Sequence, residues 1–117
     1  MKISSEQLEQ CSGADFNNRL AGIIRGIEKE SLRVDTNGHL AQTPHPKSLG
    51  SALCNSWLTT DFSESLLEFV TPTFDSINAA LGKLDELHHY AAQQLSPDEF
   101  LWPSSMPCLL PADEGMR

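Results

Sequence analysis

The sequence predicts an α+β fold in which an antiparallel sheet is covered by helices. Three segments of the 117-residue chain indicate it: two runs rich in branched apolar residues, at 21–34 and 66–71, and a long stretch of helical periodicity at 75–95. The length fits one domain, because compact domains commonly have about 100 to 150 residues. The composition, 39% hydrophobic and 21% charged residues, is that of a globular protein and not of a fibrous or disordered one.

The amino-terminal third is expected to contain a short helix and then a hairpin. A helix at residues 4–11 is indicated by Ser4 and Gln7, which have the spacing of a capping box. The run AGIIRGIEKESLRV at 21–34 is expected to be a long strand. The letters DTNG that follow contain an Asn-Gly turn signal, so a shorter partner strand is expected at 39–42.

The rest of the chain is expected to supply a second strand and the covering helix. Two prolines interrupt the chain before residues 47–53, where one or two helical turns are expected. LLEFVT at 66–71 is a strong strand candidate. The helix at 75–95 starts at an Asp75 or Ser76 cap and stops before Pro97. Its apolar stripe is formed by Ile77, Ala80, Leu81, Leu84, Leu87, His88, Ala91 and Leu95.

Charge and cysteine content limit the possible functions. Sixteen acidic and eight basic residues leave a net charge of -8, which repels phosphate backbones and anionic membranes, so neither nucleic acid nor membrane is an expected partner. The same excess is equally typical of a charge that serves solubility. Cys11, Cys54 and Cys108 are expected to be reduced thiols, and with no apolar run near the roughly 20 residues of a membrane span we expect a cytoplasmic protein.

Carboxylates interrupt the apolar faces of both strands. Side chains in a strand alternate between faces, so Glu28 and Glu30 share the more apolar face of the first strand with Leu32 and Val34. The same alternation puts Glu68 between two aliphatic residues of the second strand. Basic residues that would neutralise the pair point to the opposite face; they are Arg25, Lys29 and Arg33.

A bound cation is the partner that this pattern predicts. An ionised carboxylate taken out of water costs about several kcal/mol unless it is paired or binds a cation. Carboxylates without His or Cys beside them suit a hard ion such as Mg²⁺ or Mn²⁺, and Asp61 is placed to supply a further oxygen. The alternative is that Glu28 and Glu30 belong to a solvated edge strand and the faces are assigned one residue out of step. His88 and His89 are expected to be a packed and a solvated side chain, not ligands.

Three segments of the chain resemble the amino-terminal region of proteobacterial glutamate-cysteine ligase. They read RGIEKESLRVDTNGHLAQTPHPKSLGSAL, WLTTDFSESLLEFVTP and WPSSMPC, and the likeness covers about residues 25–108. The resemblance implies part of a glutamine synthetase-like fold whose acids hold divalent cations. It places Glu28, Glu30, Asp61 and Glu68 at metal-binding positions and Phe62 at the border of the cysteine site.

The resemblance also implies an activity and a larger protein. ATP phosphorylates the γ-carboxylate of L-glutamate, and the amine of L-cysteine then attacks the acyl phosphate, so no enzyme nucleophile is expected and no residue is assigned as catalytic. Residues 1–117 are expected to be the amino-terminal portion of a single catalytic domain that continues in a parent chain, and to be inactive alone. Two alternatives stay open: a non-catalytic acidic metal-binding or interaction module, and a related carboxylate-amine ligase that uses another amine.

Overall fold

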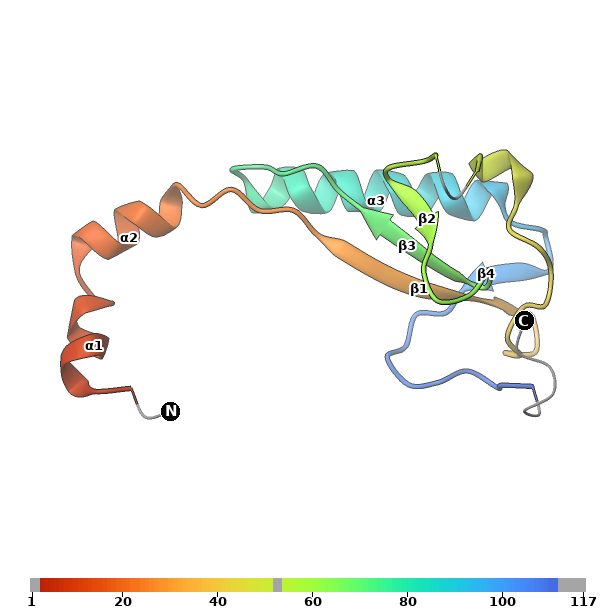
Figure 1. Cartoon of the computed structure of the whole chain (residues 1–117), viewed down its shortest axis with the longest axis horizontal. Coiled ribbons are helices and arrows are strands. Elements are labelled where there is room, and N and C mark those ends of the chain that lie inside the picture. Colours follow the sequence, from red (N-terminus) through yellow and green to blue (C-terminus); the bar gives the residue numbers. More distant parts are fainter. Residues whose placement is uncertain (1–2, 52–53, 112–117) are drawn as a thin grey trace.

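The computed structural model describes residues 3–51 and 54–111. Its strands form a four-stranded antiparallel sheet in the order β2-β3-β1-β4, and one long helix lies along the sheet (Figure 1). This arrangement confirms the α+β prediction. The elements in chain order are α1 (Ser5–Gln10), α2 (Ala14–Ala21), β1 (Glu28–Asp35), the 3₁₀ turn η1 (Lys47–Leu49), β2 (Leu58–Thr60), β3 (Leu66–Val70), α3 (Ile77–Gln94) and β4 (Glu99–Leu101).

The main core lies between the sheet and α3. Leu67 and Phe69 of β3 are fully buried, because alternate side chains of this central strand point toward the helix. Helix α3 begins at Ser76, whose hydroxyl accepts a hydrogen bond from the Ala79 amide at 3.4 Å, so one of the two expected caps is observed. The buried members of this core are Leu49, Leu58, Leu67, Phe69, Leu87 and Ala91.

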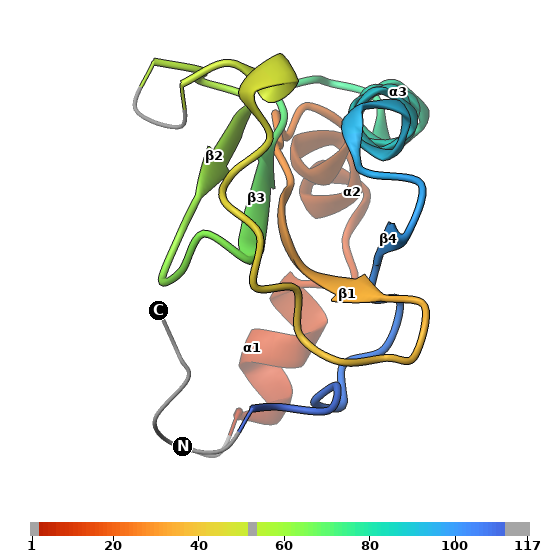
Figure 2. The same ribbon diagram turned by 90° about the vertical axis from the view of Figure 1, so that its right-hand side faces the viewer.

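A second, smaller core lies on the other face of β1, near its carboxyl end. Val34, Leu40 and Cys108 are buried there, and Leu32 and Trp102 pack against them. The segment after β4 therefore folds back across the sheet, as the end-on view shows (Figure 2).

The first strand is shorter than the sequence predicts. Residues 14–21 form helix α2, and the strand starts only at Glu28. Of the described residues before Glu28, only Arg25 forms a bridge to another segment, at Phe74, and a strand without a continuous partner leaves backbone groups unsatisfied. Helices α1 and α2 contain no buried residue and extend away from the sheet (Figure 1).

The predicted partner strand at 39–42 is also wrong, although the turn before it forms. Gly38 has φ of 81°, and its amide donates to Asp35 O at 3.0 Å. The following residues form no strand: Leu40 makes a single bridge to Val34 of β1, and His39 makes one to Leu109. The pairing stays this short because β3 already pairs with β1 up to Leu32 and leaves little free edge. The unforeseen β4 pairs with the last residues of β1 along the edge away from β3. Of the turns expected at 47–53, η1 is present, and residues 52–53 lie outside the described part.

Candidate metal-binding face of the sheet

Three of the predicted carboxylates lie on one face of the sheet. In the register of β1 with β3, Glu30 is directly opposite Glu68 and Glu28 is opposite Val70. Residues directly opposite each other in an antiparallel pair project to the same face. Since Glu28 and Glu30 are two residues apart in one strand, all three glutamates share this face, which we call the carboxylate face. The prediction that Glu28, Glu30 and Glu68 are neighbours is confirmed.

Asp61 stands at the margin of the same face. It follows β2 directly and opens the loop that leads to β3, and its amide donates to Leu66 O at 3.2 Å. The pKa of the Glu68 carboxyl is raised by partial burial and by the negative charges of Asp61, Glu28 and Glu30. The four acids therefore act on one another electrostatically. Phe62 follows Asp61 in the loop, and its side chain is 86% exposed.

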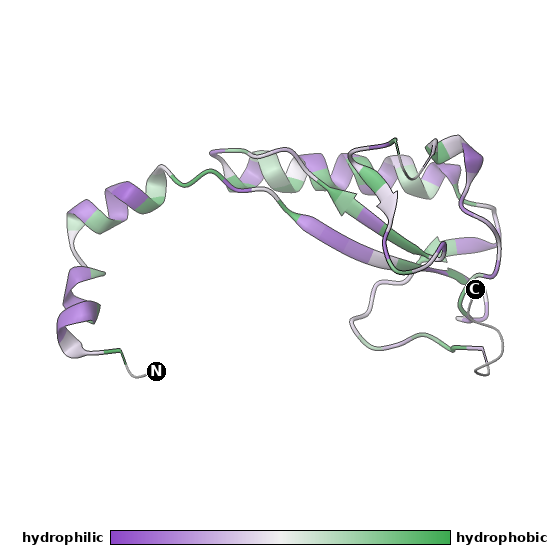
Figure 3. Cartoon of the chain, viewed as in Figure 1, coloured by the Kyte–Doolittle hydropathy of each residue, from purple (hydrophilic) through white to green (hydrophobic). Residues whose placement is uncertain are grey.

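Helix α3 covers the opposite face, which corrects the expectation that the carboxylates interrupt a buried apolar surface. Glu28 and Glu30 are exposed and Glu68 is half-buried, whereas Ser31 and Arg33, which alternate with them, are buried. The alternation itself is as predicted. Glu28 and Glu30 are therefore solvated, as the alternative interpretation held, but the faces are not assigned one residue out of step. The first half of β1 is accordingly hydrophilic in Figure 3.

No basic residue in the described part of the chain forms an ion pair with the carboxylate face. Lys29 projects to the α3 side, where its ammonium donates to Ser31 Oγ and lies 5.9 Å from the centre of the Phe69 ring. Burial lowers the pKa of this ammonium. Among the ion pairs within residues 3–51 and 54–111, none involves Glu28, Glu30, Asp61 or Glu68.

The donor chemistry of the face fits a hard divalent cation. Its donors are carboxylates crowded enough to raise the pKa of one member, and a cation would relieve that repulsion. In the part of the chain that the structure describes, no three His, Cys, Asp or Glu side chains are arranged to hold a metal ion as they stand. The face therefore supplies ligands of the right type and charge, and not a closed coordination shell.

A groove beside Glu30 was not foreseen as part of the site. It has a volume of about 380 Å³ and lies between the sheet and the segment WPSSMP. The indole N–H of Trp102 donates to Met106 O at 2.7 Å and shapes this segment. The sequence signal was present in the quoted motif, but the motif alone does not indicate that it folds over the carboxylate face. The apolar wall of the groove is formed by Leu32, Leu66, Trp102, Met106, Pro107 and Leu110.

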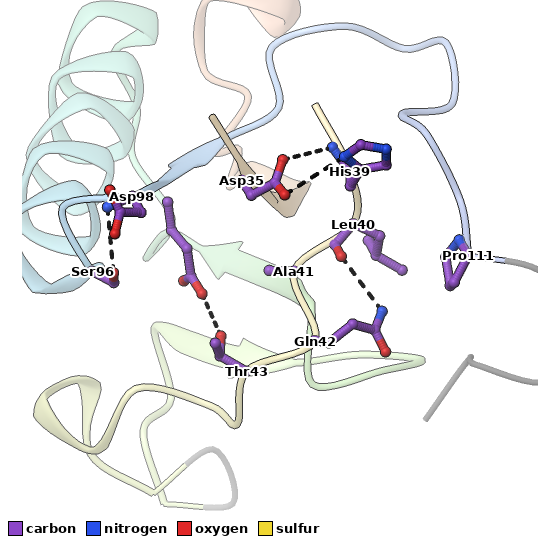
Figure 4. A pocket seen from close by; sticks show the side chains of 10 residues that line it. Asp35, His39, Leu40, Ala41, Gln42, Thr43, Ser96, Asp98 and Pro111 are labelled. Carbon is purple, nitrogen blue, oxygen red and sulfur yellow. Dashed lines mark hydrogen bonds and ion pairs between the residues drawn. The ribbon is translucent and has the colours of Figure 1, made fainter. Parts of the chain in front are cut away.

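Other titratable groups have local structural roles. A groove of about 460 Å³ between Asp35, Thr43 and Asp98 contains none of the predicted acids (Figure 4). Hydrogen bonds from the His39 and Asn37 amides lower the pKa of Asp35, which stabilises the turn. The imidazole of His88 packs edge-on against the Phe69 ring, with the ring centroids 4.4 Å apart, and burial lowers the pKa of His88. His89 is exposed, so the predicted placements, a packed His88 and a solvated His89, are confirmed.

Comparisons with known proteins agree with this geometry. The family model described as glutamate-cysteine ligase matches residues 8–117. A glutamate-cysteine ligase of Sodalis glossinidius is 58% identical over 91 residues, which are 78% of this chain and 17% of that protein. One from Alcanivorax borkumensis is 49% identical over 116 residues, 99% of this chain and 22% of that protein. The chain thus spans about a fifth of the length of these relatives.

Solved structures give the same result. A glutamate-cysteine ligase of Francisella tularensis in complex with AMP has a TM-score of 0.77 at 41% identity, over 80% of this chain and 19% of that one. A bifunctional glutathione synthetase of Pasteurella multocida has a TM-score of 0.83 at 33% identity, over 99% of this chain and 15% of that one. The expected glutamine synthetase-like fold agrees with both. No helix in the described residues is long and apolar enough to cross a membrane. The chain belongs to the glutamate-cysteine ligase family.

Proposed function

We propose that this chain is the amino-terminal portion of an ATP-dependent ligase that joins the γ-carboxylate of L-glutamate to the amine of L-cysteine, the first step of glutathione biosynthesis. The observation that carries the proposal is the carboxylate face, where Glu30 and Glu68 stand opposite each other within a segment that matches the ligase family. The AMP complex of the Francisella relative supports use of an adenine nucleotide.

Glu28, Glu30, Asp61 and Glu68 would hold Mg²⁺, or Mn²⁺ in its place. Such a cation would neutralise negative charge on the γ-phosphate of ATP and on the glutamate carboxylate that receives the phosphoryl group, two anions that otherwise repel. The residues of this chain contribute oxygen ligands and their fixed spacing. Phe62, exposed beside Asp61, would border the cysteine. No residue of the chain is required as a covalent nucleophile.

The rest of the active site is proposed to come from a longer parent chain. Relatives are about five times as long, since this chain covers 17% to 22% of them. Only eight basic residues are available here to face phosphate groups, and Arg33, one of them, is buried. We therefore infer that these residues are a portion of a single catalytic domain. We further propose a cytoplasmic enzyme without a nucleic-acid or membrane partner, in agreement with the net charge of -8.

The test is a ligase assay on the full-length protein that carries this segment. With ATP, L-glutamate and Mg²⁺, we expect L-cysteine to give γ-glutamylcysteine together with ADP and phosphate, and other amines to give less product. Glu30→Gln should raise the Mg²⁺ concentration needed for half-maximal activity, while Glu9→Gln in the exposed helix α1 should not. A preferred amine other than cysteine would favour a different carboxylate-amine ligase. No amide product with any amine would favour the non-catalytic module.

A further inference from the structure

Arg33 is a charged side chain in the interior of the protein. Its side chain is 0% exposed and lies on the α3 side of β1, away from the carboxylate face. The guanidinium pairs with Glu99 Oε2 at 2.8 Å, and the Glu99 side chain is itself only 7% exposed. It also donates to Thr43 Oγ1 at 2.8 Å and to Thr43 O at 2.7 Å. These contacts join β1, β4 and the segment after the hairpin.

One further hydrogen bond reaches the loop between β2 and β3. The guanidinium donates to Glu64 O at 3.0 Å, and the backbone amide of Arg33 donates to Ser65 O at 2.7 Å. A single residue thus holds two consecutive carbonyl groups at the end of this loop. Asp61 and Phe62 form the beginning of the same loop.

The loop is short and closed by its own hydrogen bonds, so its two ends move together. The Asp61 amide donates to Leu66 O at 3.2 Å, and the Leu66 amide donates to Ser63 O at 3.0 Å. The hydroxyl of Ser65, which is buried, donates to Ala41 O. A displacement of the carbonyl groups that Arg33 holds would therefore be passed on to Asp61.

Packing alone does not explain a charge at this position. A buried ion pair is often replaceable by apolar residues of similar volume without loss of stability, because burial of the charges costs free energy. Arg33 sits beside a core that is otherwise apolar, yet the two terminal nitrogens of its planar group donate to four acceptors from three segments. That geometry specifies where the loop lies relative to β1.

We propose that Arg33 is a positioning residue that fixes the β2–β3 loop, so that Asp61 and Phe62 are presented beside the carboxylate face. The consequence for catalysis rests on the proposed ligase function. The placement of the loop does not, because it follows from the hydrogen bonds alone.

The experiment uses the full-length protein and three variants. Arg33→Lys keeps the charge and removes the fork of donors. Thr43→Val removes one acceptor of the guanidinium and the hydrogen bond that the Thr43 hydroxyl donates to Glu99, both outside the loop. Leu87→Ala is the control, because it destabilises the core under α3 without removing a hydrogen bond of the guanidinium or of the loop. Hydrogen exchange of the Asp61 and Leu66 amides is measured without metal, and the cysteine KM, kcat and Mg²⁺ dependence are measured with it.

A positioning role predicts local effects. In Arg33→Lys the Asp61 and Leu66 amides should exchange about tenfold faster than the wild-type amides, relative to the amides of α3. The cysteine KM and the half-activating Mg²⁺ concentration should rise about tenfold, because displaced binding groups lose affinity. Thr43→Val should shift the same quantities in the same direction by less, and it carries the test if Arg33→Lys fails to fold. Leu87→Ala should speed exchange throughout and leave the KM unchanged.

Two results would overturn the proposal. One is that, in both Arg33→Lys and Thr43→Val, the exchange of the Asp61 and Leu66 amides rises no more than exchange elsewhere. The other is that both variants keep the wild-type cysteine KM and Mg²⁺ dependence, provided that the wild-type protein is active. Absence of ligase activity in the wild-type protein would count against the proposed function alone, and the exchange data would then decide the role of Arg33.

Discussion

Phe69 packs β3, the strand that carries Glu68, against helix α3. It is 0% exposed, and it pairs with Lys29 of β1 on one side and with Leu58 of β2 on the other. Its ring also meets His88 of α3 edge-on, with the centroids 4.4 Å apart and the planes at 82°. Phe69→Ala would therefore open a cavity where three strands meet the helix.

The expected loss can be worked from these contacts. Deletion of a buried phenyl ring costs about 3 to 5 kcal/mol, and an edge-to-face pair contributes about 0.5 to 1.5 kcal/mol of such a loss. Because Phe69 is fully buried and makes that contact, we expect at least the middle of the range, about 4 kcal/mol in the free energy of unfolding. The total free energy of unfolding of a domain is about 5 to 15 kcal/mol, so the variant should be close to unfolding at 25 °C.

Urea denaturation followed by tryptophan fluorescence measures this loss, since Trp57 and Trp102 adjoin the two edge strands of the sheet, β2 and β4. Phe62→Ala is the matched control, because it makes the same chemical change at a ring that is 86% exposed, and it should cost less than about 0.5 kcal/mol. A loss below about 1 kcal/mol for Phe69→Ala, or equal losses for the two variants, would refute the assignment of the core to the α3 side of the sheet.

Three further predictions concern the carboxylates and the extent of the chain. The raised pKa of Glu68 means that the native state binds its proton more tightly than the unfolded state, so stability falls as pH rises from the ordinary value of 4.5 through the higher native pKa. Glu68→Gln should thus raise the melting temperature at pH 7 and not below about pH 4, and an equal shift at both pH values would contradict this. Glu28→Gln in the full-length protein should weaken Mg²⁺ binding by calorimetry while the metal-free melting temperature stays equal or rises; a destabilised variant with normal Mg²⁺ dependence would end the metal-ligand interpretation. The 117-residue chain alone should form no γ-glutamylcysteine. ATP hydrolysis coupled to formation of this product by the chain alone would contradict the prediction.

Local patterns in the sequence were sufficient for the elements whose signal depends on neighbouring residues. The period of two in a strand puts Glu28 and Glu30 on one face whatever the strand pairs with, and the register with β3 adds Glu68 to them. The apolar stripe and cap of α3 are equally local, and the helix forms within one to two residues of its expected ends. The family motifs likewise lie within short segments, so the sequence alone is sufficient to identify the ligase family.

Only the tertiary structure decided which face is covered and which segments become neighbours. Leu32 and Val34 made the carboxylate face appear the buried one, but they are covered by the segment after β4, while α3 packs on the face of Ser31 and Arg33. Residues 21–27 have strand-like letters but form only one bridge, between Arg25 and Phe74, and β4 takes an edge that its own sequence does not reveal. Arg33 is buried because acceptors from three distant segments converge on it. A strand fixes only the alternation of its side chains, and burial depends on contacts between residues far apart in the chain.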